Sequence, residues 1–174
     1  MKKTQFNSFN FTVTLTLLFW SGNLLSADWQ KQGSTSYVTH FMIRPSSTID
    51  VGASGKAIAL DMVGTTANME GDKLMDKMTA QCVALQIYSK EKNYIDGGCV
   101  LTDKDGDKIF STFDTRELDK STPGFTCGTH IIVGGSGKYE GMSGKEPFNC
   151  AILPAAGAGW SGMDVEHHLT YKFD

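Results

Sequence analysis

The glycine-rich stretch from Gly134 to Gly144 constrains the fold of this chain more than any other segment. Five of its eleven residues are glycine, and an apolar run that carries a cysteine lies on each side of it. Glycine adopts the positive φ angles that tight turns need, at no steric cost. The stretch therefore predicts a sharp connection between two strands and offers few reactive side chains.

Apolar and polar residues alternate along most of the chain, and almost no segment shows the 3.6-residue period of an amphipathic helix. Alternation is typical of strands that bury one face. About eight short strands separated by tight turns indicate a closed barrel or a sandwich, and closure removes exposed sheet edges. Residues 66–77 fit a strand, a short helix or a lid equally well. The expected strands are residues 35–44, 56–64, 75–88, 95–103, 107–114, 124–133, 145–153 and 163–173.

The N-terminus has the pattern of a secretory signal. Met1-Lys2-Lys3 is basic, an apolar run extends from Phe11 to Trp20, and Leu25-Ser26-Ala27 ends in small residues. We expect residues 1–27 to be a signal peptide and residues 28–174 to form one β-barrel domain. A membrane-spanning helix needs roughly 20 apolar residues, more than this run provides. We expect a secreted or periplasmic protein with no stable membrane insertion, and an uncleaved anchor remains the alternative.

The charge of the chain argues against nucleic acid as a partner. The chain has 16 Lys and Arg residues against 19 Asp and Glu residues, and the predicted leader contains two of the lysines and no acid. The mature protein is therefore more acidic than the whole chain, whereas binding to a phosphate backbone requires an excess of positive charge.

Four cysteines in an exported chain favour two disulfides over free thiols. If the runs before and after Lys90 pair antiparallel, Cys82 lies opposite Cys99. The same construction across the glycine-rich stretch places Cys127 opposite Cys150, about a centre between residues 138 and 139. Four cysteines allow three connectivities, and we predict the two that bridge hairpins.

The pattern Gly135-Ser136-Gly137-Lys138-Tyr139-x-Gly141-Met142-x-Gly144, with the preceding Asp105-Gly106-Asp107-Lys108-Ile109-Phe110, resembles the allene oxide cyclase-like barrel family. The family includes secreted bacterial members, and the dirigent proteins are more distant relatives. The resemblance covers about the last two-thirds of the mature chain and implies a single antiparallel barrel of eight strands with an apolar lumen. It implies a fold and not one chemistry, and the catalytic residues of the plant cyclases are not matched here.

His167 is the first candidate for catalysis. Alternation places it on one face of the last strand with Val165, Leu169 and Tyr171, and places His168 on the other face. An imidazole on an apolar face has the chemistry of a general base or of a polar anchor for a ligand. The alternative is a core histidine that is hydrogen-bonded to a neighbour.

Asp61 is the second candidate, provided that its face, shared with Ala57, Ala59 and Val63, looks into the lumen. An acid in a confined apolar space has a raised pKa and suits acid–base chemistry. If Ile58, Leu60 and Met62 face inward instead, Asp61 is solvated.

Four further residues are candidates for ligand binding. His40 and His130 would join His167 if their strand faces also line the lumen, Tyr139 would pack at or cap the barrel opening, and Tyr171 shares the face of His167. The histidine spacing does not demand a metal, so we predict no metal and no cofactor.

Two motifs look functional but fail their spacing. Asp103-x-Asp105-Gly106-Asp107 lacks the ligand positions of a calcium-binding EF-hand loop and predicts a hairpin turn. Gly135-Ser136-Gly137-Lys138 lacks the first glycine and the final Ser or Thr of a phosphate-binding loop.

These features predict an exported barrel that binds a small hydrophobic molecule in its lumen and either carries it or guides its cyclisation or isomerisation. The alternative is a structural or interaction protein whose barrel is filled by its own side chains and whose loops, such as residues 65–73, or dimer faces do the work. The sequence does not decide whether the protein forms a homo-oligomer. The volume of the lumen discriminates between the two functional hypotheses.

Overall fold

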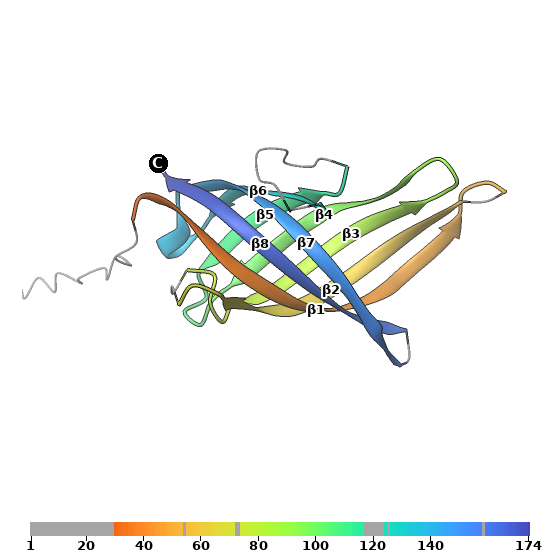
Figure 1. The fold of residues 1–174 in the computed structure, drawn as a ribbon, viewed down its shortest axis with the longest axis horizontal. Coiled ribbons are helices and arrows are strands. Elements are labelled where there is room, and N and C mark those ends of the chain that lie inside the picture. The colour runs from red at the N-terminus through yellow and green to blue at the C-terminus, as the bar shows by residue number, and fades with distance from the viewer. Residues whose placement is uncertain (1–29, 54, 72–73, 117–123, 125, 158) are drawn as a thin grey trace, which may run out of the picture.

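The computed structural model describes residues 30–53, 55–71, 74–116, 124, 126–157 and 159–174. Eight antiparallel strands follow one another around a closed barrel, in which β1 pairs with β8 (Figure 1). This confirms the all-β barrel. The predicted signal peptide lies outside the described residues. The strands are β1 (Gln32–Asp50), β2 (Lys56–Asn68), β3 (Thr79–Tyr88), β4 (Asn93–Thr102), β5 (Lys108–Asp114), β6 (Gly128–Gly135), β7 (Met142–Gly157) and β8 (Trp160–Phe173).

Alternation decides which side chains fill the barrel. On β8, Val165, His167 and Leu169 are buried, and the residues between them lie toward the outside. On β2, Leu60 and Met62 are buried. Among the described residues, no helix has the length and apolar character needed to cross a membrane.

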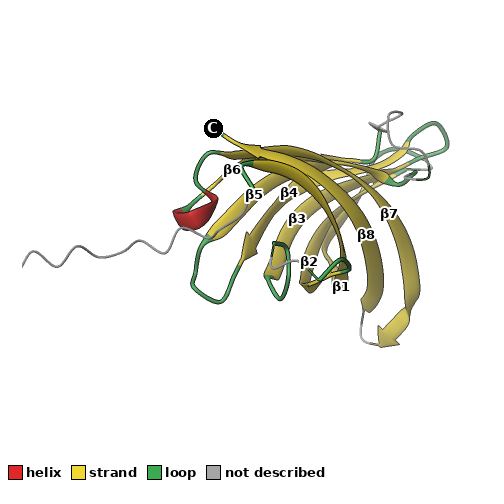
Figure 2. Ribbon diagram, turned by 60° about the vertical axis from the view of Figure 1, so that its left-hand side comes forward, coloured by secondary structure: helices red, strands yellow, loops and turns green. Residues whose placement is uncertain are grey.

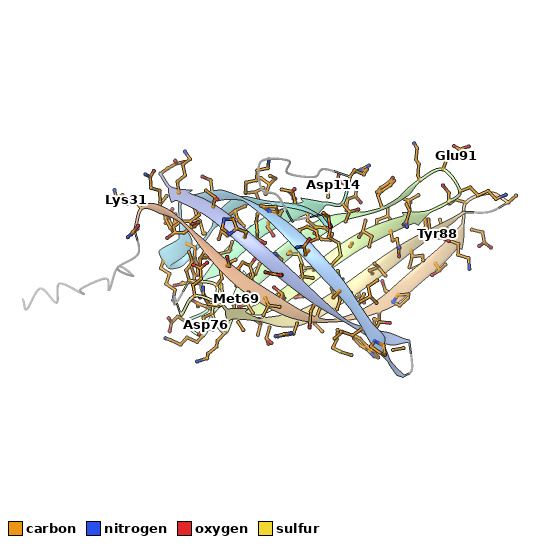
Figure 3. All side chains as sticks on the ribbon, in the orientation of Figure 1. Lys31, Met69, Asp76, Tyr88, Glu91 and Asp114 are labelled. Carbon is orange, nitrogen blue, oxygen red and sulfur yellow. A yellow bond between two sulfur atoms is a disulfide. The ribbon has the colours of Figure 1, made fainter. Side chains whose placement is uncertain are left out.

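The two ends of the barrel differ. At one end, which we call the closed end, the connections β2–β3, β4–β5 and β6–β7 meet the chain termini of the barrel; at the other, the open end, lie the remaining four connections. Figure 3 labels Lys31 and Asp76 toward the closed end and Tyr88 and Glu91 at the open end. The only helix among the described residues, the short 3₁₀ helix η1 (Gly137–Tyr139), lies at the closed end beside the C-terminus (Figure 2).

The β2–β3 connection plugs the closed end. Leu74, Met75 and Met78 are at most 1% exposed. The Asn68 side chain anchors them, because its Nδ2 donates to the Leu74 carbonyl and to Thr35 Oγ1, both at 2.8 Å. Met75 adopts a φ of 61°, which costs a non-glycine residue on the order of 1 kcal/mol and is offset by its burial. Within the ambiguous residues 66–77, residues 66–68 thus end β2, and Leu74 and Met75 are buried in the closed end.

The glycine-rich stretch docks on the β4–β5 hairpin. Gly137 has a φ of 61°, and a Cβ there would collide with the Asp107 carboxylate. Lys138 Nζ contacts Asp103 Oδ2 and lies 2.8 Å from Asp105 Oδ2, while the Tyr139 hydroxyl donates to Asp103 Oδ2 at 3.1 Å. Residues 103–107 form the predicted hairpin turn, and Tyr139 is buried at the closed end.

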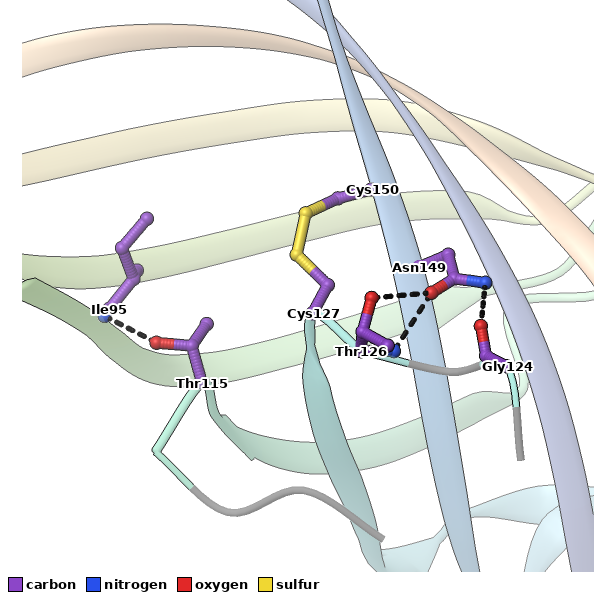
Figure 4. The surroundings of a disulfide bond; sticks show 7 residues. All are labelled: Ile95, Thr115, Gly124, Thr126, Cys127, Asn149 and Cys150. Atoms are coloured by element: carbon purple, nitrogen blue, oxygen red, sulfur yellow. Dashed lines mark hydrogen bonds between the residues drawn. A yellow bond between two sulfur atoms is a disulfide. The ribbon is translucent and has the colours of Figure 1, made fainter. Parts of the chain in front are cut away.

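Both predicted disulfides are present, Cys82–Cys99 and Cys127–Cys150. Cys82 lies directly opposite Cys99 in the β3–β4 register. In the second hairpin Gly128 pairs with Phe148, so the register differs by one residue from the direct pairing predicted for Cys127 and Cys150. Beside this bridge, Asn149 accepts from the Thr126 N–H at 2.9 Å and donates to the Gly124 carbonyl at 2.7 Å (Figure 4).

The Lys138 contacts predict a pH-dependent contribution to stability. Burial by itself would raise the pKa of Asp103, but the hydrogen bond and charge of Lys138 hold it below its usual value of 3.8. A carboxyl whose pKa is depressed by folding stabilises the protein above its unfolded pKa, and this stability is lost as the pH falls through the folded pKa. Lys138→Met should therefore lower the free energy of unfolding by about 1–2 kcal/mol at neutral pH, and this deficit should shrink as the pH falls below 3.8 and through the depressed pKa of Asp103.

Urea denaturation of both proteins across this pH range measures the effect. Lys56→Met removes an exposed lysine at the start of β2 and should change stability by less than about 0.5 kcal/mol at every pH. A Lys138→Met deficit of equal size at pH 3 and pH 7 would contradict the assignment.

Candidate functional site

Four buried polar side chains meet inside the barrel, and we call them the polar cluster: Tyr37, His130, Glu146 and His167. They come from β1, β6, β7 and β8, respectively, and none is more than 7% exposed. Every strand that contributes also buries apolar side chains on the same face. A charged group in such surroundings requires a partner, because its desolvation is costly.

His167 is held on two edges and one face. Its Nδ1 lies 2.6 Å from Glu146 Oε1, and its Nε2 lies 3.1 Å from Thr39 Oγ1. Its ring stacks on Tyr37, with centroids 4.4 Å apart and an angle of 10° between the planes. The stacking follows from the β1–β8 register, in which Tyr37 lies opposite His167. The orientation of the imidazole is therefore set by three different contacts.

His130 completes the cluster from the neighbouring strand. It lies opposite Glu146 in the β6–β7 register, and its Nδ1 lies 3.1 Å from Ser111 Oγ. Its ring meets the His167 ring edge to face, with centroids 5.4 Å apart. One ligand atom from each of His130, Glu146 and His167 falls within 4.8 Å of the others.

Burial and charge shift the pKa values of the cluster in different directions. Burial lowers the pKa of His130 to about 4, against the opposing charge of Glu146. Burial alone would raise the pKa of Glu146, but the charge and close contact of His167 outweigh it and hold the pKa below its usual value. Burial and then the Glu146 carboxylate raise the pKa of Tyr37. At neutral pH, Glu146 is thus an anion, and Tyr37 and His130 are neutral.

A cavity of about 250 Å³ lies in the barrel toward the open end. Its wall is mainly apolar. It is lined by Ile43, Pro45, Leu60, Met62, Gln86, Ile95, Phe113, Thr115, Cys127, Phe148, Cys150, Ile152, Ser161, Gly162 and Met163.

Phe113 and Phe148 form an aromatic floor between this cavity and the polar cluster. Both rings line the cavity, and each has its centroid 5.0 Å from that of His130. The Phe148 ring also lies 5.9 Å from the His167 ring. The cluster therefore lies one side-chain layer below the cavity and does not itself line it.

The structure brings together two of the predicted site residues, His167 and His130. Tyr171 is also buried, on the same face of β8 as His167 but toward the closed end, where its ring packs edge to face on Phe173. Tyr139 lies in the closed end and is 2% exposed. Neither tyrosine lines the open-end cavity.

His40 and Asp61 lie on the outside of the barrel. The His40 side chain is 55% exposed, and its Nδ1 lies 2.8 Å from Asp164 Oδ1. Asp61 accepts from Arg44 Nη2 at 3.3 Å. Leu60 and Met62 take the inward positions of β2, so the condition under which Asp61 would have entered the lumen is not met.

Sequence reasoning missed Glu146 and Tyr37. Glu146 precedes Phe148 by two residues on β7, so both side chains lie on the same face. On this face Glu146 is charged, whereas its neighbours Gly144, Phe148 and Cys150 are not. The same alternation places Tyr37 with Thr35, Thr39 and Phe41. Each signal was present in the sequence, but it becomes informative only when the inward faces are known.

Comparison of the sequence with known protein families finds no match, and comparison with curated proteins finds none either. Among solved structures, the chain is similar to that of the pterocarpan synthase dirigent protein GePTS1, with 12% identity and a TM-score of 0.48. The match covers 84% of this chain and 88% of that one.

The buried pair makes Glu146 important for stability. Glu146→Ala leaves buried His167 Nδ1 without its carboxylate partner, and leaving a buried polar atom unpaired costs about 1–3 kcal/mol. Glu140→Ala, which truncates an exposed glutamate beside the 3₁₀ helix, should change stability by less than about 0.5 kcal/mol. Guanidinium denaturation at neutral pH compares the two, and equal stabilities would show that the pair contributes nothing net.

Proposed function

We propose that the protein binds a small hydrophobic molecule in the cavity toward the open end of its barrel. The cavity of about 250 Å³ with its mainly apolar wall supports this proposal. Ligand sites are usually concave and apolar, with a few polar groups that orient the ligand. Here Gln86 and Ser161 supply such groups, whereas the Thr115 hydroxyl already accepts from the Ile95 N–H at 2.8 Å (Figure 4).

The size of the cavity limits the ligand. Ligand pockets commonly measure about 300–1,000 Å³, and a cavity of about 150 Å³ accommodates benzene. A cavity of about 250 Å³ suits a molecule of one or two rings. At the closed end, by contrast, Leu74, Met75 and Met78 are buried.

We further propose that the protein works outside the cytoplasm, secreted or in a periplasm. Two disulfides within one small barrel support this, because disulfides persist in oxidising compartments. The signal-peptide pattern of residues 1–27 supports the same location. The mature protein would then be the barrel of residues 28–174.

Binding, and not catalysis, is the function that the geometry supports best. A general acid or base must come within about 2.6–3.2 Å of the atom that exchanges the proton. The aromatic floor separates His167 from the cavity, so cyclisation or isomerisation assisted by His167 would require Phe113 or Phe148 to move.

The binding proposal is tested with 2-naphthol, a two-ring probe with one hydroxyl. Saturating probe should raise the Tm of the wild-type protein by several degrees, because it binds only the folded state. Met163→Trp fills part of the cavity and should abolish the shift, while Glu166→Trp adds the same indole to the outer face of β8 and should leave it intact.

Ligand-observed NMR at matched concentrations confirms binding without relying on stability. An equal Tm shift in Met163→Trp and Glu166→Trp would place the probe elsewhere and overturn the proposal. No binding of 2-naphthol or of a panel of one- and two-ring hydrophobic molecules would favour the interaction-type barrel.

A further inference from the structure

Three side chains of metal-ligating type converge in the middle of the barrel. His130, Glu146 and His167 lie on the adjacent strands β6, β7 and β8, and one ligand atom from each falls within 4.8 Å of the others. We propose that these three residues bind one divalent transition-metal ion, with Zn²⁺ the best fit to the donor set. Two imidazoles and one carboxylate form a common three-residue zinc site, and the same set also holds Fe²⁺.

In each of the two imidazoles, one ring nitrogen already lies within hydrogen-bond distance of a hydroxyl group. Ser111 Oγ lies 3.1 Å from His130 Nδ1, and Thr39 Oγ1 lies 3.1 Å from His167 Nε2. Metal-binding histidines are usually held in this way, by a polar group on the nitrogen that does not face the metal. The arrangement leaves His130 Nε2 and His167 Nδ1 to act as ligands.

Two of the polar atoms that could bind the ion, Glu146 Oε2 and His167 Nδ1, lack good hydrogen bonds within the part of the chain that the structure describes. Among the described residues, Glu146 Oε2 has no hydrogen-bond partner, although Glu146 is 1% exposed. His167 Nδ1 lies 2.6 Å from Glu146 Oε1 but makes no well-directed hydrogen bond to it. Buried polar atoms without partners are costly and rare in folded proteins. A cation between these atoms would satisfy the second carboxylate oxygen and the ring nitrogen together.

The surroundings favour tight binding and slow exchange. Tyr37 stacks on His167, and the aromatic floor of Phe113 and Phe148 covers both imidazoles, so water is largely excluded. Zinc–ligand bonds of about 2.0–2.1 Å place neighbouring ligands roughly 3.3 Å apart. His167 Nδ1 and Glu146 Oε1, now 2.6 Å apart, must therefore separate slightly, while His130 draws in toward them from within 4.8 Å. We expect the ion to enter during folding or during a transient opening of the floor.

The experiment loads the full mature chain by refolding it with its disulfides intact in the presence of Zn²⁺, followed by dialysis and elemental analysis. We expect one retained equivalent of zinc and a Tm above that of protein refolded with chelator, since the ion binds the folded state. Refolding with Co²⁺ should produce the visible absorption of a low-coordinate nitrogen and oxygen site.

Variants separate this site from surface histidines. Glu146→Gln and His130→Gln should lower the affinity for Zn²⁺ by more than about 100-fold, and Thr39→Val or Ser111→Ala by about 10–100-fold. His40→Gln and His168→Gln remove histidines from the outer face and should retain the full equivalent. Circular dichroism of each metal-free variant verifies folding, and the two hydroxyl variants test the site if a ligand variant does not fold.

Two outcomes overturn the proposal. Wild-type protein that retains no zinc and shows no cobalt absorption after refolding has no such site. Zinc that is retained equally by Glu146→Gln and Thr39→Val but lost in His40→Gln is bound at the surface pair His40–Asp164 instead. Neither outcome bears on 2-naphthol binding in the cavity, which is measured separately.

Discussion

Closure of the sheet by the pairing of β1 with β8 is the constraint on which the rest of the structure depends. It makes one face of each strand an inside face and leaves no exposed sheet edge. It also builds the polar cluster, because the register sets Tyr37 opposite His167 and brings Thr39 to the imidazole. Without this pairing, His167 and Glu146 would lie on an open sheet, where water would replace their mutual contact.

The packing of the lumen differs between the two ends of the barrel. At the closed end, Leu74, Met75, Met78 and Tyr139 are buried, and Lys138 joins the β6–β7 and β4–β5 connections through its contacts with Asp103 and Asp105. Toward the open end the side chains leave a cavity. The lumen is therefore packed with buried side chains at one end and contains a cavity toward the other.

The polar cluster lies at the boundary between these two regions. Its groups compensate one another: the Glu146 anion faces His167, and neighbouring hydroxyls hold both imidazoles. Phe148 belongs to both regions, because its ring packs on His130 and His167 and also lines the cavity. A movement of this one ring would connect the cavity with the cluster, so the two proposed sites are separate in composition but adjacent in space.

The sequence by itself determined the elements of this protein. Alternation located all eight strands, symmetry about the turns paired Cys82 with Cys99 and Cys127 with Cys150, and the apolar neighbours of His167 placed it inside. Only the tertiary structure decided which face of the other strands looks inward, because a period of two defines two faces without choosing between them. On β2 both faces carry apolar residues, and barrel closure turned Leu60 and Met62 inward and Asp61 out. Tertiary structure also placed Glu146 beside His167 and left His40 on the outside, since contacts between distant strands depend on the register around the whole barrel.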